Sequence, residues 1–258
     1  MGLKELKTFL AEKADDYNHP AFIASDPIAL PHAFQKPQDI EIIGFFAAIM
    51  AWGQRKTILN KGWELIQKMD YEPYQFVKQH ELNDLAAFSD FVHRTLQPAD
   101  VKGLLQFLQH HYEAHDSLET CFIPADPEVE EPMERGLMQF RQALAAFPEL
   151  PGRTLKHIAS PAKKAACKRL NMFLRWMVRH DDKGVDFGLW QQLRSADLFC
   201  PVDVHVARMA RHLRMLTRKQ VDWQATKELT IALRKLDSND PVRFDFALFG
   251  LGIEGFAR

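Results

Sequence analysis

The sequence of 258 residues has little cysteine, no long apolar run and few signals for β-strands. Its three cysteines, Cys121, Cys167 and Cys200, are too few and too scattered for a disulfide scaffold or a zinc ribbon. No apolar run approaches the length of a membrane span, and the charged N-terminus lacks the apolar segment that an export signal needs. We therefore expect a cytoplasmic protein without a membrane partner.

The shortage of strand signals excludes most β architectures. Alternation of apolar and polar residues is rare, whereas apolar residues recur at spacings of three and four nearly throughout. This pattern predicts an all-α fold, and a hydrophobic content of 47% can fill a large core. Helices are expected over 3–17, 39–52, 73–80, 100–112, 133–146 and 160–180, with the acidic, proline-broken segment 116–132 as a loop.

The segment 39–52 is apolar on most faces, which is typical of a buried helix. GQRKT (53–57) follows it, with Gly53 placed to end this helix and Thr57 placed to cap the next one. Gln54 and Arg55 are then expected on a turn between two helices. A glutamine on a surface turn is ordinary, so this position alone indicates no function.

Charge is unevenly distributed although the net charge is only −1. Residues 150–180 hold eight Lys or Arg and no acid, and residues 204–221 hold five more. Eight acids gather in 113–134, without a basic residue. Such asymmetry can concentrate positive potential on one face, although solvated helix faces beside an acidic loop would give the same pattern.

Residues 160–180 predict a helix that Ser160 caps and Pro161 begins. With about 100° per residue, the apolar residues share one face. Such a helix could bind phosphates along a basic stripe, but charged faces are more often only solvated. The stripe consists of Lys164, Lys168, Asn171, Arg175 and Arg179.

Asp203 lies in CPVDVHV (200–206), directly before a basic helix-like run that includes Arg208. An aspartate here would cap the N-terminus of that helix. It could equally be a carboxylate held where a reaction needs negative charge. His205 would either hydrogen-bond within such a site or pack on the helix.

Three segments together resemble the helix-hairpin-helix DNA glycosylases. PVDVHVARMARHL resembles their Asp-containing segment, in which P-V-D-x-H recurs. DIEIIGFFAAIMAWGQRKTILNKGWEL resembles their first pair of core helices, and AACKRLNMFLRWM lies where their second hairpin helix opens with a catalytic Lys. In addition, KRLNMFLRWMVR and DPVRFDFALFGLG resemble a bacterial family of unknown function.

The sequence departs from the glycosylase pattern in several places. LPG (150–152) is not followed by a second hairpin glycine, and alanines precede Lys168 where glycines would let the backbone approach a phosphate. The separation of 35 residues between Lys168 and Asp203 is long, as in the archaeal oxidised-guanine glycosylases, which carry an insertion here. No four-cysteine pattern follows Asp203, so no iron–sulfur cluster is expected.

The resemblance implies base-excision chemistry. Asp203 would stabilise positive charge on the sugar, and the amine of Lys168 would attack the anomeric carbon, with Lys164 as the alternative nucleophile. Gln54 would lie in or beside the gap that a flipped nucleotide leaves. DNA contacts are expected from Gln54, Arg55, Lys164, Arg169, Arg175, His205 and Arg208.

The resemblance also implies a two-lobed, monomeric all-α protein. A helical barrel with a hairpin-like element is expected over 38–199, and a second lobe from 1–37 and 200–258, with Lys168 and Asp203 facing each other across a cleft. The expected activity is a DNA glycosylase, with or without AP-lyase activity, acting on double-stranded DNA with a damaged base such as an oxidised purine. The alternative is a non-catalytic nucleic-acid-binding protein that keeps the fold.

No metal or other cofactor is expected. The potential ligands His110, His111, His115 and Cys121 match no standard spacing of a metal site.

Overall fold

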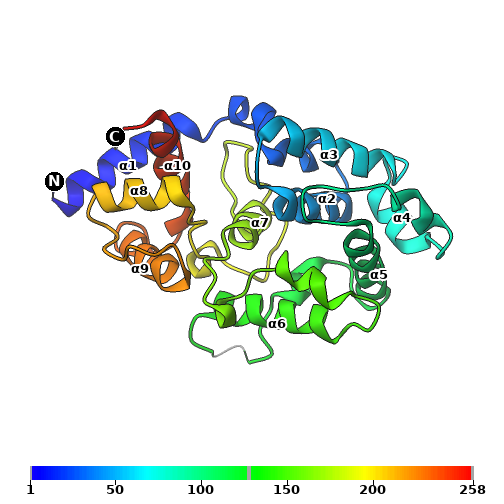
Figure 1. Ribbon diagram of the computed structural model, residues 1–258. Helices are drawn as coiled ribbons and strands as arrows, with labels where there is room; N and C mark the ends of the chain where they lie inside the picture. The colour runs from blue at the N-terminus through cyan, green and yellow to red at the C-terminus, as the bar shows by residue number, and fades with distance from the viewer. Residues whose placement is uncertain (1, 127–128, 257–258) are drawn as a thin grey trace. The chain divides into compact units, whose positions relative to one another are not determined.

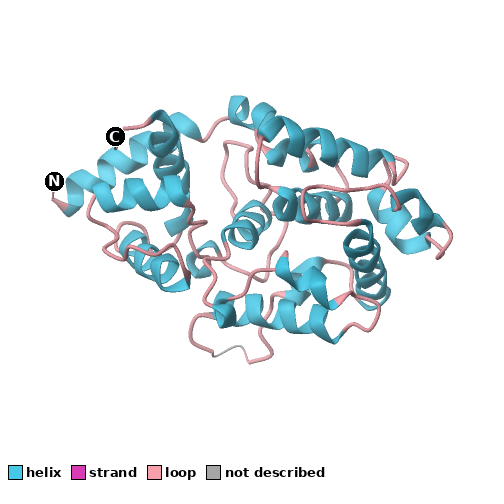
Figure 2. Cartoon of the chain, viewed as in Figure 1, coloured by secondary structure: helices cyan, strands magenta, loops and turns pink. Residues whose placement is uncertain are grey.

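The computed structural model describes residues 2–126 and 129–256, which form helices, turns and loops without a β-strand (Figures 1 and 2). The all-α prediction is confirmed. Among these residues no helix is both long enough and apolar enough to cross a membrane. The α-helices are α1 (Leu3–Tyr17), α2 (Pro37–Met50), α3 (Arg55–Gln67), α4 (Pro73–Gln79), α5 (Pro98–Ala114), α6 (Pro132–Ala146), α7 (Lys168–Val178), α8 (Val204–His212), α9 (Trp223–Arg234) and α10 (Asp245–Glu254).

The turn between α2 and α3 differs in detail from the sequence prediction. Helix α2 ends at Met50, before Gly53, whose φ of 102° places it in the left-handed region that favours glycine. Helix α3 begins at Arg55 with Gln54 at the N-cap position, so Thr57 lies inside the first turn and does not cap it.

The predicted helix 160–180 is wrong in its first half. Residues Pro161–Lys163 form a single 3₁₀ turn, and the α-helix begins only at Lys168. Lys164 and Cys167 between them have φ values of 58° and 53°. Helix α9 holds this segment, because the backbone N–H of Trp223 donates to the Lys164 carbonyl at 3.1 Å, and the Thr226 hydroxyl donates to the Ala166 carbonyl at 3.2 Å.

The chain divides into two compact units. We call Met1–Ala24, Glu130–Glu134 and Ala159–Arg258 the first unit, and Ser25–Val129 and Arg135–Ile158 the second unit. These bounds differ from the predicted lobes at two places, because residues 159–199 belong with the C-terminal helices and residues 25–37 belong to the second unit. The contacts of α9 with Lys164 and Ala166 are one physical reason for the first difference.

In the first unit, α1 and α8 both pack against α10 (Figure 1). The N-terminal helix therefore returns to the C-terminal segment, as the sequence reading predicted. Close approach requires glycine at two positions of α10. A Cβ on Gly250 would lie 2.5 Å from the Tyr17 ring, and one on Gly252 would lie 2.8 Å from the His205 carbonyl oxygen.

In the second unit, α2 is the central helix, and α3 and α4 pack against it. Every residue from Ile40 to Met50 is buried, as the apolar character of this segment predicted. Aromatic rings extend this core to α5 and α6, since Phe140 lies 5.7 Å from Phe45 and 6.2 Å from Phe107 between ring centroids.

Candidate active site

Asp203 caps α8, as the sequence predicted. Its Oδ1 atom accepts hydrogen bonds from the backbone N–H groups of His205 and Val206, at 2.9 and 3.0 Å. Its Oδ2 atom makes no hydrogen bond to any residue that the structure describes. The cap therefore fixes the half-buried carboxylate and leaves one oxygen available to a ligand.

Lys168 is the first residue of α7 and is half-buried. Its Nζ atom lies 3.4 Å from the sulfur of Met172 and 5.9 Å from the ring centroid of Phe249. The amine thus has a partly apolar surrounding, built from its own helix and from α10. A lysine amine placed in this way can act as a nucleophile.

Asp245, the first residue of α10, joins these two side chains electrostatically. The pKa of its carboxyl group is raised to about 6, with burial as the largest cause. The positive charges of Arg175 and Lys168 act against this rise, and the negative charge of Asp203 adds to it. Lys168 and Asp203 thus share an electrostatic partner, the Asp245 carboxylate, which the sequence pattern did not indicate.

Helix α10 also contributes Phe249, one turn after Asp245. This half-buried ring is perpendicular to that of His205, with 6.5 Å between the centroids. The Nδ1 atom of His205 is buried and has no hydrogen-bond partner within the described part of the chain. The aromatic positions in 244–249 have mixed spacing, so no periodic pattern in the sequence could have marked Phe249 as a neighbour of Lys168.

The predicted basic stripe on α7 is wrong for three of its five members. Asn171, Arg175 and Arg179 are buried, with exposed fractions of 1%, 4% and 4%. Arg175 contacts Asp186 and Asp245, so its guanidinium is an interior ion-pair partner and does not face a phosphate. Arg179 contacts three carboxylates, those of Asp181, Asp186 and Asp240.

The other basic residues predicted for DNA contact in the first unit have different surroundings. Lys164 is exposed in the left-handed turn before α7. Arg169 is half-buried, and burial lowers its pKa. Arg208 is exposed, but its guanidinium donates to the carbonyl of Gly252 at 2.5 Å, which ties α8 to the end of α10.

Gln54 and Arg55 belong to the second unit, where both are exposed at the start of α3. Beside them, the guanidinium of Arg94 lies 4.5 Å from the Trp52 ring centroid. A Cβ on Gly53 would lie 2.6 Å from Arg94 Nη1, the flexible end of that side chain, so glycine is favoured here by its positive φ of 102° more than by space. Trp52 and Arg94 were missed from the sequence because they are about forty residues apart.

The structure describes no group of three or more His, Cys, Asp and Glu side chains that could hold a metal ion. The sulfur of Cys121 lies 3.3 Å from Nδ1 of His111. Burial and the nearby charge of Glu41 raise the pKa of the Cys121 thiol to about 12, which favours a protonated, unreactive thiol.

Comparison with known proteins gives a family but no activity. Residues 26–254 match the model of a family described as "Protein of unknown function (DUF2400)", and the chain therefore belongs to this family. No curated protein and no solved structure matches the chain.

Proposed function

We propose that this protein is a DNA repair glycosylase of the helix-hairpin-helix kind, in which Lys168 and Asp203 act on a damaged nucleotide. The observation that carries the proposal is that Lys168 lies beside the ring of Phe249, which also contacts His205, whose backbone N–H donates to the Asp203 carboxylate. Both residues lie at positions to which the sequence resemblance assigns catalytic roles, and the two are 35 positions apart in the chain.

The proposed role of Asp203 follows from its cap geometry. Cleavage of an N-glycosidic bond develops positive charge on the sugar, which a fixed carboxylate stabilises. The cap on α8 holds one carboxylate oxygen and leaves Oδ2 for this charge. No movement of the side chain is then required during the reaction.

The proposed role of Lys168 is that of the nucleophile. Its neutral amine attacks the anomeric carbon, and the damaged base leaves with the bonding electrons and one amine proton. The C1′–O4′ bond of the sugar then breaks, O4′ takes the second amine proton, and the resulting imine permits a lyase step. Position and surroundings support this assignment, because the amine lies at the start of α7 between Met172 and Phe249. Lys164 remains the alternative, one exposed turn earlier.

Contact with nucleic acid is supported by features of both units. In the first unit, Lys164 is exposed in the turn before α7, where a lysine can contact a phosphate. In the second unit, Gln54 and Arg55 accompany a tryptophan–arginine stack, a combination that binds bases and phosphates in other proteins.

A binding protein without chemistry is the second candidate. The observation that favours it is the turn before α7, where Lys164 and Cys167 adopt left-handed conformations without glycine. A Cβ at these positions limits how closely a phosphate can approach the backbone.

Borohydride trapping on duplex oligonucleotides with single lesions, oxidised guanine first, tests the proposal. We expect a covalent protein–DNA adduct that Lys168→Gln abolishes, because an amide forms no imine. Asp203→Asn should keep DNA binding and slow base release by roughly a hundredfold or more, since it removes the charge but keeps the cap. Lys163→Gln, an exposed change of equal charge on the same turn, is the matched control.

Each alternative has its own outcome. Trapping that persists in Lys168→Gln and disappears in Lys164→Gln would show that Lys164 is the nucleophile. Salt-sensitive DNA binding without base release from any lesion would favour the binding protein. Failure to bind DNA at low salt would contradict both candidates.

A further inference from the structure

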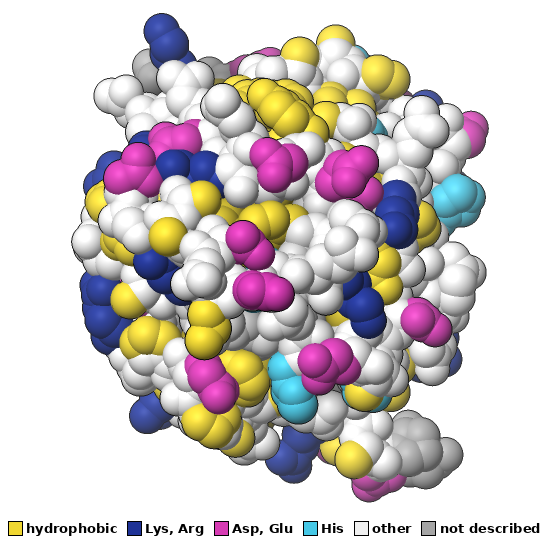
Figure 3. All heavy atoms as spheres, turned by 90° about the vertical axis from the view of Figure 1, so that its right-hand side faces the viewer, with side chains coloured by type: hydrophobic (Ala, Val, Ile, Leu, Met, Phe, Trp, Pro, Cys, Tyr) yellow, Lys and Arg dark blue, Asp and Glu magenta, His cyan; other side chains and the backbone are white. Residues whose placement is uncertain are grey.

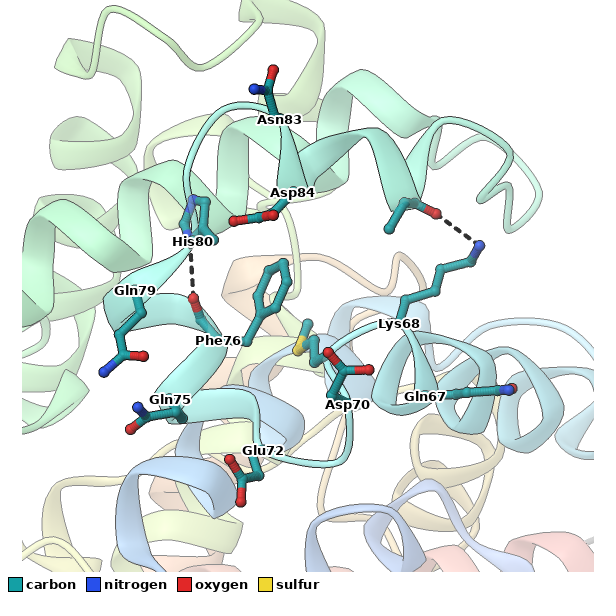
Figure 4. Close-up of a pocket in the computed structure, with 12 residues that line it drawn as sticks. Gln67, Lys68, Asp70, Glu72, Gln75, Phe76, Gln79, His80, Asn83 and Asp84 are labelled. Atoms are coloured by element: carbon teal, nitrogen blue, oxygen red, sulfur yellow. Dashed lines mark hydrogen bonds between the residues drawn. The ribbon is translucent and has the colours of Figure 1, made fainter.

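The second unit carries an open groove that the proposed chemistry does not use. It has a volume of about 640 Å³ and lies between the end of α3, helix α4 and the segment 83–87 (Figure 4). In Figure 4 the ring of Phe76 lies between the carboxylates of Asp70 and Asp84. The lining residues are Gln67, Lys68, Met69, Asp70, Glu72, Gln75, Phe76, Gln79, His80, Asn83, Asp84 and Ala87.

The lining of this groove has more negatively charged side chains than positively charged ones. Asp70, Glu72 and Asp84 contribute carboxylates to the lining. Lys68 is the one cation among the lining residues, and its ammonium already contacts the Ala87 carbonyl at 2.8 Å and the Asp90 carboxylate at 2.7 Å. The groove therefore has an unbalanced negative charge.

His80 adds a buried acceptor to the same lining. Its ring is 7% exposed and stacks on Phe76 with 5.3 Å between centroids. Nδ1 lies 3.1 Å from the carbonyl oxygens of Phe76 and Val77, which only accept, so Nδ1 carries the proton of the neutral ring. Nε2 is then an acceptor, and it has no partner in the described part of the chain.

Two exposed apolar residues are neighbours in the sequence of residues that line the groove. Tyr71, beside Asp70, is 59% exposed, and Leu82, beside Asn83, is 75% exposed. Figure 3 views the face that carries α4 and has Asp and Glu side chains around its middle, with Lys and Arg mostly nearer its margins. Apolar residues beside an acidic groove are typical of a surface that binds another protein.

We propose that this groove binds an arginine side chain of a partner polypeptide. A guanidinium has five N–H donors and no acceptor, which complements the carboxylates and amide oxygens of the lining. Its flat face also stacks on aromatic rings such as Phe76. The apolar residues Tyr71 and Leu82 then contact the chain on either side of the arginine.

Calorimetric titration of the full-length protein tests this inference, with the capped peptide Gly-Leu-Arg-Leu-Gly as the probe. The comparison peptide carries citrulline, which has nearly the shape of arginine without its charge. We expect the arginine peptide to bind and the citrulline peptide to bind roughly tenfold more weakly. Equal affinity for the two peptides, or no binding of either, would overturn the proposal.

Variants localise the binding. Asp70→Asn with Glu72→Gln should weaken binding of the arginine peptide by roughly tenfold. Asparagine suits the left-handed conformation of residue 70, whose φ is 53°, so the variant should fold. Glu149→Gln, an exposed change elsewhere in the second unit, should leave affinity unchanged. Unchanged affinity in the double variant, or competitive displacement by Mg²⁺ at constant ionic strength, would contradict an arginine site.

Discussion

Two of the buried carboxylate sites, one taken from each unit, are held in different ways. In the first unit, Asp245 and Asp186 contact the guanidinium of Arg175, which has an exposed fraction of only 4%. In the second unit, Glu41 accepts hydrogen bonds from neutral groups. These are the hydroxyls of Tyr112 and Ser117, at 2.7 and 2.5 Å, and the backbone N–H of Leu118, at 3.0 Å.

The difference shows what each site contributes. The neutral donors attach α5, through Tyr112, and the segment after it to the buried helix α2. In the first unit, Asp245 responds to the charges of Arg175, Lys168 and Asp203, so its core ion pair is coupled to the candidate active site.

The largest expected effect comes from breaking the ion pair in the first unit. Arg175→Met should lower the free energy of unfolding by about 3–5 kcal/mol, because it leaves Asp245 buried without its arginine. Denaturant unfolding followed by circular dichroism measures this loss. Arg135→Met, at an exposed position of α6, should change stability by less than about 0.5 kcal/mol. A loss below about 1 kcal/mol in Arg175→Met would mean that the core tolerates the bare carboxylates.

The pH dependence of stability sharpens the comparison at Asp245. Its pKa in the folded protein is about 6, above its ordinary value of 3.8, so the folded state binds more protons between these values. Its contribution to stability is complete below the lower value and is lost as the pH rises through the higher one. Asp245→Asn lacks this loss, so the stability advantage of the wild type over the variant should shrink by about 2–3 kcal/mol between about pH 4 and pH 7.

Unfolding curves of both proteins across this pH range make the measurement. Subtracting the free energy of unfolding of the variant from that of the wild type removes the contribution of groups that titrate alike in both proteins. An advantage that stays constant or grows with pH would show that Asp245 is already ionised at acidic pH.

The smallest effect is expected at Glu41. Glu41→Gln keeps the shape of the side chain but replaces an acceptor oxygen by a donor, and should cost about 2 kcal/mol. Because the lost contacts are local, proteolysis near Ser117 should accelerate while the reactions at Lys168 stay unchanged. Limited proteolysis with mass spectrometry measures the first result, and the trapping assay measures the second. A loss of trapping in Glu41→Gln would contradict the separation of the two sites.

Much of the helical framework was predictable because it depends on local signals. The buried character of α2 followed from its continuous apolar sequence, and the limits of α1 and α6 followed from periodicity. The cap on α8 followed in the same way, because Asp203 bonds N–H groups only two and three residues along the chain.

The start of α7 was not predictable from such signals. Ser160 and Pro161 are a normal helix start, yet only a 3₁₀ turn forms there. The reason lies in α9, whose Trp223 and Thr226 bond the carbonyls of Lys164 and Ala166, so that these oxygens have partners outside a helix. Those partners are about sixty residues away.

The sequence by itself determined the helical class, the buried helix α2 and the capped aspartate, because each depends on residues within one or two helical turns. Only the tertiary structure decided that Arg175 and Arg179 are interior and that Phe249 lies near Lys168. Periodicity predicted a solvated basic face, but Asp245 and Asp240, which lie 70 and 61 residues from their arginines, act together with the nearer Asp181 and Asp186 to neutralise these arginines and allow their burial. A helical pattern records which face carries charge, and the partners brought by the fold decide whether that face meets water or the core.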